Sequence, residues 1–282
     1  MFYPTRVEKE DFIIRRYDHV VRGNEIAKEH SWLKDYEKDG FAICRNFFNN
    51  AEMFDALEAS KQIIQDNFFF KVNEPSLNQV RSALNVHHHP KLGSLLSNKR
   101  IKAISRYIVG PKPYIHQSRI NYKSGKEATG WHWHSDYETW SYQDGMPNMS
   151  CFSFMIPLTA NNVGNGCLKV IPRSHKLFIS VKKSSSESSA YDNFTDQKEG
   201  VPSGESIETI KSLLGVRTKL IECSPSDLVI FDCNLLHASD ANTTGKPRTN
   251  LFFVVNDKSN FLREIDNPRP EPMGVRSNLT FI

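Results

Sequence analysis

Residues 131–140 read Trp-His-Trp-His-Ser-Asp-Tyr-Glu-Thr-Trp and contain the pattern His134-x-Asp136. Residues two apart on a β-strand point to the same face, so we expect this imidazole and this carboxylate to face one point in space. They would supply two of the three ligands in the 2-His-1-carboxylate triad that binds non-haem Fe(II). The segment therefore predicts an iron site on a β-strand scaffold.

A distant histidine has to complete such a triad. The candidate is His237, which follows the apolar run Leu228–Phe231. Farther along lies Arg248, whose planar guanidinium suits a carboxylate because it donates two parallel hydrogen bonds. The alternative for Arg248, which follows the turn residues 245–247, is a surface arginine. Together His134, Asp136, His237 and Arg248, in this order along the chain, predict a metal site that binds O2 and a dicarboxylate co-substrate, 2-oxoglutarate.

Length and composition indicate one ordinary globular unit. The chain has 282 residues, of which 39% are hydrophobic and 24% charged, with a net charge of +4. All-β barrels of this size commonly fold as one domain, so we expect a single domain over residues 1–282. Lysines and arginines are scattered, which gives no sign of nucleic-acid binding. A homodimer is allowed by the sequence but not indicated by it.

Targeting and redox signals favour the cytoplasm. The first eleven residues lack the apolar core of a signal peptide, and no apolar run reaches the length of a membrane span. The 5 cysteines include no C-x-x-C pair. This pattern favours neither a disulfide framework nor a thiolate zinc site. We therefore expect a cytoplasmic enzyme.

The first part of the chain has helical patterns. An amphipathic segment at 24–38 ends at Asp39-Gly40, and Asn49-Asn50 can cap a helix that carries Met53, Leu57 and Ile63. A third helix is expected at 92–108. Between these helices His87-His88-His89-Pro90 suggests a metal, but consecutive side chains diverge and proline breaks regular structure. A solvated loop is therefore favoured there.

After residue 113 the pattern changes to strands. Besides a short strand at 41–44, we expect strands at 114–122, around His134, and at 151–158, 168–171, 228–231 and 249–256. The strand at 114–122 places Gln117, Arg119 and Asn121 on one face. The strand at 249–256, with the residue before it, places Arg248, Asn250 and Phe252 on one face. Such a polar face is either exposed to solvent or lines the interior of a barrel. The fold class is therefore α+β and mainly β, with helices first and a barrel or sandwich after.

Residues 182–206 form the low-complexity region of the chain and include Ser184-Ser185-Ser186-Glu187-Ser188-Ser189. This composition cannot build a core. The segment is either a mobile surface loop or a lid over the site. A short helix is expected near 206–214.

Residues 131–153 resemble the signature segment of the ectoine hydroxylases, in the phytanoyl-CoA dioxygenase superfamily of Fe(II)/2-oxoglutarate enzymes. The shared residues in this segment are Trp133–Asp136, Glu138–Trp140, Asp144–Pro147, Met149 and Ser153. The similarity continues at Tyr3-Pro4-x-Arg6, Glu74-Pro75, Arg81-Ser82, Tyr114–Tyr122, Ile171-Pro172, Gly200–Pro202 and Phe231–Asn234. It thus covers nearly the whole chain, and it implies a double-stranded β-helix (jelly roll, cupin-like) flanked by N-terminal helices.

The resemblance also implies roles for particular residues. Iron would be held by the catalytic ligands His134, Asp136 and His237. The residues implied for 2-oxoglutarate are Asn121, Trp131, Ser153, Ser239 and Arg248. Those implied for ectoine are Gln117, Trp140, Phe231, Asn250 and Phe252, with Cys151 at the same pocket. The expected reaction hydroxylates ectoine to 5-hydroxyectoine, a compatible solute of osmotic stress, and oxidatively decarboxylates 2-oxoglutarate to succinate and CO2.

The chain departs from the family pattern at Trp131, Ser141 and Ser150–Phe152. These changes bear on the substrate more than on the reaction, and they keep two alternatives open. One is a hydroxylase of the same class acting on another small zwitterion or amino acid. The other is a non-enzymatic cupin-like binding protein, against which the complete triad with Arg248 argues.

Overall fold

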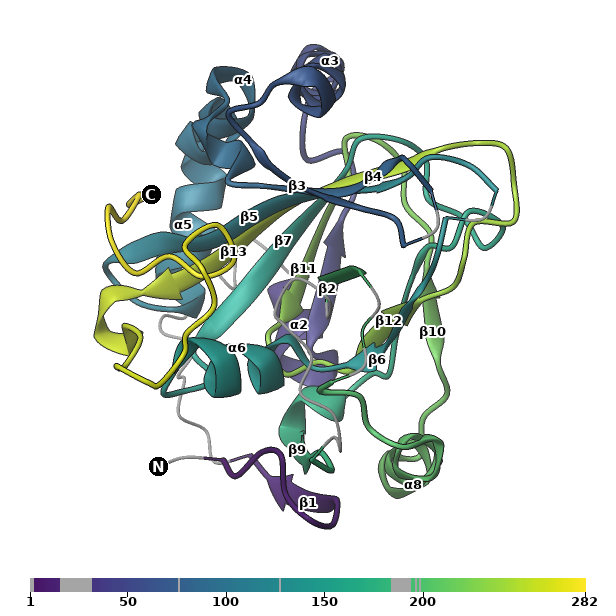
Figure 1. The fold of residues 1–282 in the computed structure, drawn as a ribbon, viewed down its shortest axis with the longest axis vertical. Coiled ribbons are helices and arrows are strands. Elements are labelled where there is room, and N and C mark those ends of the chain that lie inside the picture. The colour runs from purple at the N-terminus through teal and green to yellow at the C-terminus, as the bar shows by residue number, and fades with distance from the viewer. Residues whose placement is uncertain are drawn as a thin grey trace.

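Two antiparallel β-sheets face each other in the computed structural model (Figure 1), which describes residues 3–15, 32–75, 77–126, 128–183, 194–195, 197 and 199–282. The larger sheet has the strand order β2 (Phe41–Cys44), β11 (Leu228–Asp232), β7 (Cys151–Pro157), β13 (Arg248–Asp257), β5 (Pro113–Lys123), β4 (Val80–Leu84) and β3 (Phe70–Asn73). The smaller has the order β10 (Lys219–Ile221), β8 (Leu168–Val170), β12 (His237–Ser239) and β6 (Trp131–His134). A separate pair joins β1 (Asp11–Ile14) to β9 (Leu177–Ser180). This mainly β arrangement confirms the predicted jelly roll.

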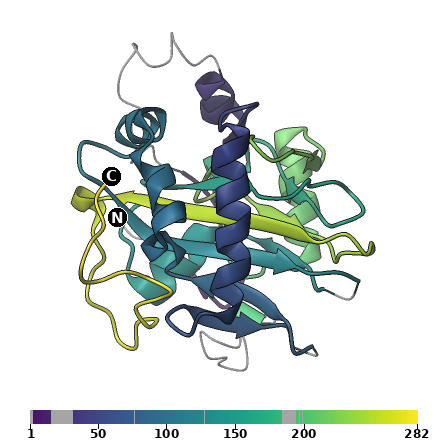
Figure 2. The same ribbon diagram turned by 90° about the horizontal axis from the view of Figure 1, so that it is seen from above.

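Helices flank the larger sheet. The α-helices are α2 (Leu33–Asp39), α3 (Asn50–Gln65), α4 (Pro90–Gly93), α5 (Lys99–Ile108), α6 (Asp136–Asp144) and α8 (Gly204–Leu214). The 3-10 helices are η1 (Val86–His88), η2 (Ser94–Ser97), η3 (Ser174–Lys176) and η4 (Lys258–Asn260). Figure 2 shows α3 crossing the strands of the larger sheet. As predicted, Asn49 caps α3, in a capping box with Glu52.

The main hydrophobic core lies between the helices α2, α3, α4 and α5 and the outer face of the larger sheet. It includes Met53 and Ile63 of α3 and, from β13, the alternate residues Leu251, Phe253 and Val255. Fully burying one such side chain contributes about 1.5–3 kcal/mol. The residues between them on β13 point the other way, into the space between the two sheets. The barrel interior, not solvent, therefore receives the polar face predicted from alternation.

Other sequence-based expectations need correction. The helix expected at 92–108 is divided, because η2 interrupts it and Asn98 caps a new helix by accepting a hydrogen bond from the Arg100 amide. The expected solvated loop at 87–90 is wrong in part, since His87 is buried in η1 and its Nδ1 lies 2.6 Å from Ser118 Oγ. The strands β1, β3, β4, β9, β10 and β12 were not predicted.

Two expectations fall partly outside the described residues. The helix expected at 24–38 ends as predicted with α2, where Gly40 adopts a left-handed φ of 83°, but residues 16–31 are not described. The same holds for residues 184–193 of the low-complexity region, so the choice between loop and lid stays open. No helix in the described parts of the chain has the length and apolar character needed to cross a membrane.

Candidate metal centre

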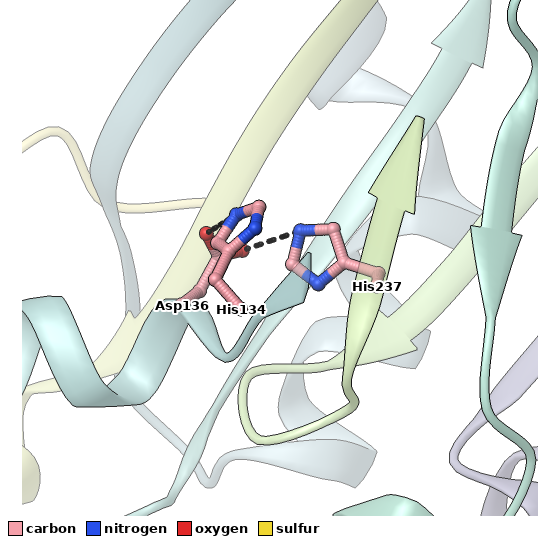
Figure 3. Close-up of side chains that lie close together, drawn as sticks. All are labelled: His134, Asp136 and His237. Atoms are coloured by element: carbon pink, nitrogen blue, oxygen red, sulfur yellow. Dashed lines mark ion pairs between the residues drawn. The ribbon is translucent and has the colours of Figure 1, made fainter. Parts of the chain in front are cut away.

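Three side chains converge between the two sheets: His134 at the end of β6, Asp136 at the start of α6 and His237 at the start of β12 (Figure 3). His134 and His237 are directly opposite each other on neighbouring antiparallel strands, which places both imidazoles on one face. His134 Nε2 lies 3.8 Å from Asp136 Oδ1, and His237 Nε2 lies 3.9 Å from Asp136 Oδ2. In the described residues this is the group of three that could hold a metal ion.

The position of Asp136 corrects the strand argument. Asp136 is not on the strand with His134, because β6 ends at His134 and α6 begins two residues later. The chain turns at Ser135, and the Tyr137 amide donates to the Cys233 carbonyl over 2.9 Å. An aspartate in the first turn of a helix is stabilised by the helix dipole. Convergence of the two ligands thus comes from a strand-to-helix turn.

Backbone carbonyls fix the orientation of both imidazoles. His134 Nδ1 lies 2.7 Å from the His132 carbonyl, and His237 Nδ1 lies 2.9 Å from the Leu235 carbonyl. A carbonyl only accepts, so Nδ1 carries the proton in each ring and Nε2 keeps its lone pair. This is the second-shell arrangement found around metal-binding histidines.

The electrostatics of the centre suit a cation. Burial, together with His237, lowers the pKa of His134 to about 3, and burial also lowers the pKa of His237. Burial alone would raise the pKa of Asp136, but His237 and Arg119 outweigh it and lower that pKa. Two neutral imidazoles and one carboxylate are the protonation states that a divalent metal requires.

One buried oxygen atom of Asp136 is suited to bind a cation. Asp136 Oδ2 is buried and accepts no hydrogen bond from any described residue. Burying an unsatisfied carboxylate oxygen costs free energy unless a cation or donor compensates it. The donor set of two nitrogens and one oxygen fits Fe(II) with open coordination positions.

A cavity surrounds the centre and receives most of the residues implied by the resemblance. Those lining it are Asn121, Trp131, Trp140, Ser239, Arg248, Asn250 and Phe252, besides the three metal-ligand candidates. Arg248 is 3% exposed, which excludes the surface alternative. Its Nη1 donates to the Gly166 carbonyl over 2.6 Å, whereas its Nε has no partner among the described residues.

Four of the implied residues do not line this cavity. Ser153 and Phe231 are fully buried on neighbouring strands, and the Phe231 ring centroid lies 5.1 Å from that of His237. Cys151 belongs to a core cluster with Tyr3 and Trp140. Gln117 lies behind the cavity, where its amide nitrogen donates to the Met273 carbonyl and its oxygen accepts from Arg119.

The cavity also contains residues that were not assigned to it from sequence. These are Arg119, Thr139, Gln143, Met155, Leu168, Phe194, Gln197, Ala238 and Arg269. Alternation along β5 had placed Arg119 on the inward face, and its Nη2 lies 3.9 Å from Asp136 Oδ1. No periodic signal in the sequence marks Phe194, Gln197 or Arg269, and the last two lie outside helices and strands. Arg269 is held by a two-pronged ion pair with Asp144.

Comparison with known proteins gives consistent matches. Residues 36–250 match the model of the family described as phytanoyl-CoA dioxygenase (PhyH). The chain is 35% identical to the ectoine dioxygenase of Bordetella parapertussis, over 97% of this chain and 92% of that protein. It is 37% identical to the ectoine dioxygenase of Halomonas elongata, over 92% of this chain and 80% of that protein.

Solved structures agree. EctD from S. alaskensis with 2-oxoglutarate and 5-hydroxyectoine is 31% identical and superposes with a TM-score of 0.83, covering 97% of this chain and 94% of that one. EctD from the same organism with bound Fe is 30% identical, with a TM-score of 0.83 over 98% and 94% of the two chains.

Proposed function

This chain belongs to the phytanoyl-CoA dioxygenase family, and we propose that it is the Fe(II)- and 2-oxoglutarate-dependent enzyme that hydroxylates ectoine to 5-hydroxyectoine. The observation that carries the proposal is the convergence of His134, Asp136 and His237 in a cavity that also holds Arg248. A binding protein without catalysis has no need of three ligands that leave coordination positions open.

When bound, iron and 2-oxoglutarate supply the oxidising chemistry, in which decarboxylation to succinate and CO2 drives insertion of one oxygen atom from O2 into a C–H bond. The protein supplies the geometry. His134, Asp136 and His237 would hold the metal. The buried Arg248 would bind the far carboxylate of 2-oxoglutarate through paired hydrogen bonds, with little competition from water.

The cavity suits a small zwitterion. Ectoine carries a delocalised amidinium cation and a carboxylate. We assign the cation to the aromatic faces of Trp140 and Phe194, since each cation–π contact contributes about 0.5–2 kcal/mol. We assign the carboxylate to the side of the cavity where Arg119 and Arg269 lie. Gln117, expected to bind substrate directly, accepts a hydrogen bond from Arg119 over 2.6 Å, which supports a role through Arg119.

The positions at which the chain departs from the family pattern differ in whether they line the cavity. Cys151 does not line the cavity, and it belongs to the same buried cluster as the cavity residue Trp140, which supports an indirect effect on the substrate pocket. Trp131 does line the cavity, between the Phe194 ring at 5.9 Å and the Arg81 guanidinium at 4.1 Å. These neighbours support the proposal that the Trp131 ring fits beside the co-substrate and leaves room for ectoine at Trp140.

The deciding experiment incubates the protein with Fe(II), 2-oxoglutarate, ascorbate and ectoine, followed by mass spectrometry. The expected product is ectoine with one added oxygen, formed in step with succinate. Proline and other zwitterions form the comparison panel. A hydroxylated product from proline but none from ectoine would contradict the substrate assignment and leave the iron chemistry in place.

We further propose one catalytic domain over residues 1–282 in a cytoplasmic protein, acting as a homodimer. The five cysteines are all free thiols, as in a reducing compartment. Cell fractionation tests the location, limited proteolysis tests the single domain, and light scattering at several protein concentrations tests the dimer.

A further inference from the structure

Lys123 is a buried lysine in the wall of the barrel. It ends β5, is 2% exposed, and continues the inward row formed by Arg119 and Asn121. Its Nζ lies 3.0 Å from the hydroxyl of Ser239, which lines the cavity, and it also donates to the Asp240 carbonyl. Lys123 itself does not line the cavity, so it reaches the site through Ser239.

Lys123 and Arg248 form an unusual pair. They are directly opposite on neighbouring antiparallel strands, which places both cationic side chains on one face. Like charges in this position are destabilising, and burial increases the cost because water cannot screen them. No aspartate or glutamate in the described part of the chain forms an ion pair with either. Two protonated side chains in this arrangement are balanced when an anion enters the cavity.

The surroundings explain why Lys123 can exist without an anion. Burial, with Arg248 and Arg81, lowers the pKa of Lys123 to about 6, and the opposing effects of Asp240 and Glu74 are weaker. Both carboxylates form ion pairs with other side chains, Asp240 with Lys169 and Glu74 with Arg81. At neutral pH the amine is therefore mostly uncharged, and the clash with Arg248 is relieved.

We propose that Lys123 is a positioning residue for 2-oxoglutarate, taking up a proton when the co-substrate binds and then orienting the Ser239 hydroxyl toward it. A dicarboxylate on Arg248 offsets the positive charge of that guanidinium, which adds to burial in keeping the amine neutral. The resulting ammonium donates to Ser239 Oγ. The Ser239 proton is then free to point at the bound carboxylate, whereas a neutral amine can accept that proton instead.

This inference rests on the proposed function, because it assumes 2-oxoglutarate as the ligand. The test is calorimetric titration of the Fe(II)-loaded enzyme with 2-oxoglutarate without O2, in buffers that differ in ionisation enthalpy. Wild type should take up close to one proton above about pH 6, and its affinity should fall up to about tenfold per pH unit. Lys123→Met should show neither effect, and Lys91→Met, an exposed lysine paired with Asp55, should behave as wild type.

Lys123→Arg provides a second variant that keeps the charge. It should bind 2-oxoglutarate without proton uptake and with a flat pH profile, because arginine stays protonated. In a double-mutant cycle, Lys123→Met should weaken binding less in a Ser239→Ala background than alone. Proton uptake that is absent from wild type, or unchanged in Lys123→Met and Lys123→Arg, would overturn the inference. Failure of 2-oxoglutarate to bind the wild-type enzyme at all would contradict the proposed function instead.

Discussion

His134 and Asp136 belong to different secondary-structure elements, yet His134 Nε2 lies 3.8 Å from Asp136 Oδ1. The strand ends at the histidine and the helix begins at the aspartate. The connection through the single residue Ser135 therefore sets the ligand geometry, and substitutions there act on the metal before they act on the fold.

Removing any one ligand should abolish turnover and leave a folded protein. His134→Ala, Asp136→Ala and His237→Ala each delete one of three donors, so Fe(II) binding should be lost or strongly weakened. Metal analysis after dialysis and circular dichroism measure the two effects. The matched control is His132→Ala, since this exposed side chain is dispensable while its carbonyl still orients His134. Full iron content with full activity in a variant would remove that residue from the ligand set.

Arg248→Ala should raise the requirement for 2-oxoglutarate far more than that for ectoine. Loss of a buried contact to a carboxylate costs on the order of 2–5 kcal/mol, because the co-substrate charge is left unpaired. Steady-state kinetics with each substrate varied in turn separates the two KM values. Equal increases in both would indicate a structural role for Arg248.

Trp140→Phe should weaken ectoine binding and spare the slow decay of 2-oxoglutarate that occurs without ectoine. The milder substitution is needed because Trp140 is 1% exposed and packs in a core cluster, so alanine would cost about 3–5 kcal/mol of stability. Succinate formation measured with and without ectoine gives the ectoine-dependent rate and the slow rate of 2-oxoglutarate decay. A parallel loss of the two activities would argue against a substrate contact.

Asp144→Asn should destabilise the protein by about 3–5 kcal/mol near neutral pH, since it leaves the buried Arg269 guanidinium uncompensated. Burial alone would raise the pKa of Asp144, but Arg269 and His116 lower it below the ordinary value. The carboxylate therefore stabilises the wild type above the ordinary aspartate pKa, and this contribution is lost as pH falls through the lowered one. Urea unfolding at several pH values should show that the free energy of unfolding falls toward acid pH in the wild type. This fall should be smaller in Asp144→Asn.

The identity of the three ligands could be predicted from sequence because His134 and Asp136 are two residues apart and a distant histidine had to complete the set. The reason given for their convergence was wrong, since Asp136 lies in α6 and not on the strand with His134. Arg248 and Asn250 followed from the same two-residue period. Phe194 and Arg269 could not be predicted, because they come from segments without a period and are placed only by distant contacts such as that with Asp144. The prediction of one continuous helix at 92–108 was wrong for a different reason. Its apolar pattern continues through η2, and only Asn98, a favoured capping residue, marked the true start of α5.

The alternation of β13 has a consequence for engineering. Its inward residues Arg248, Asn250 and Phe252 line the cavity, while the intervening Leu251 and Phe253 belong to the core beneath the helices. The two faces of β13 thus pack in different places, since the inward Phe252 belongs to a second buried cluster with Met155 and Val170. A library that varies only Asn250 and Phe252, and keeps Arg248 for the co-substrate, should change the substrate pocket and leave the core beneath the helices intact.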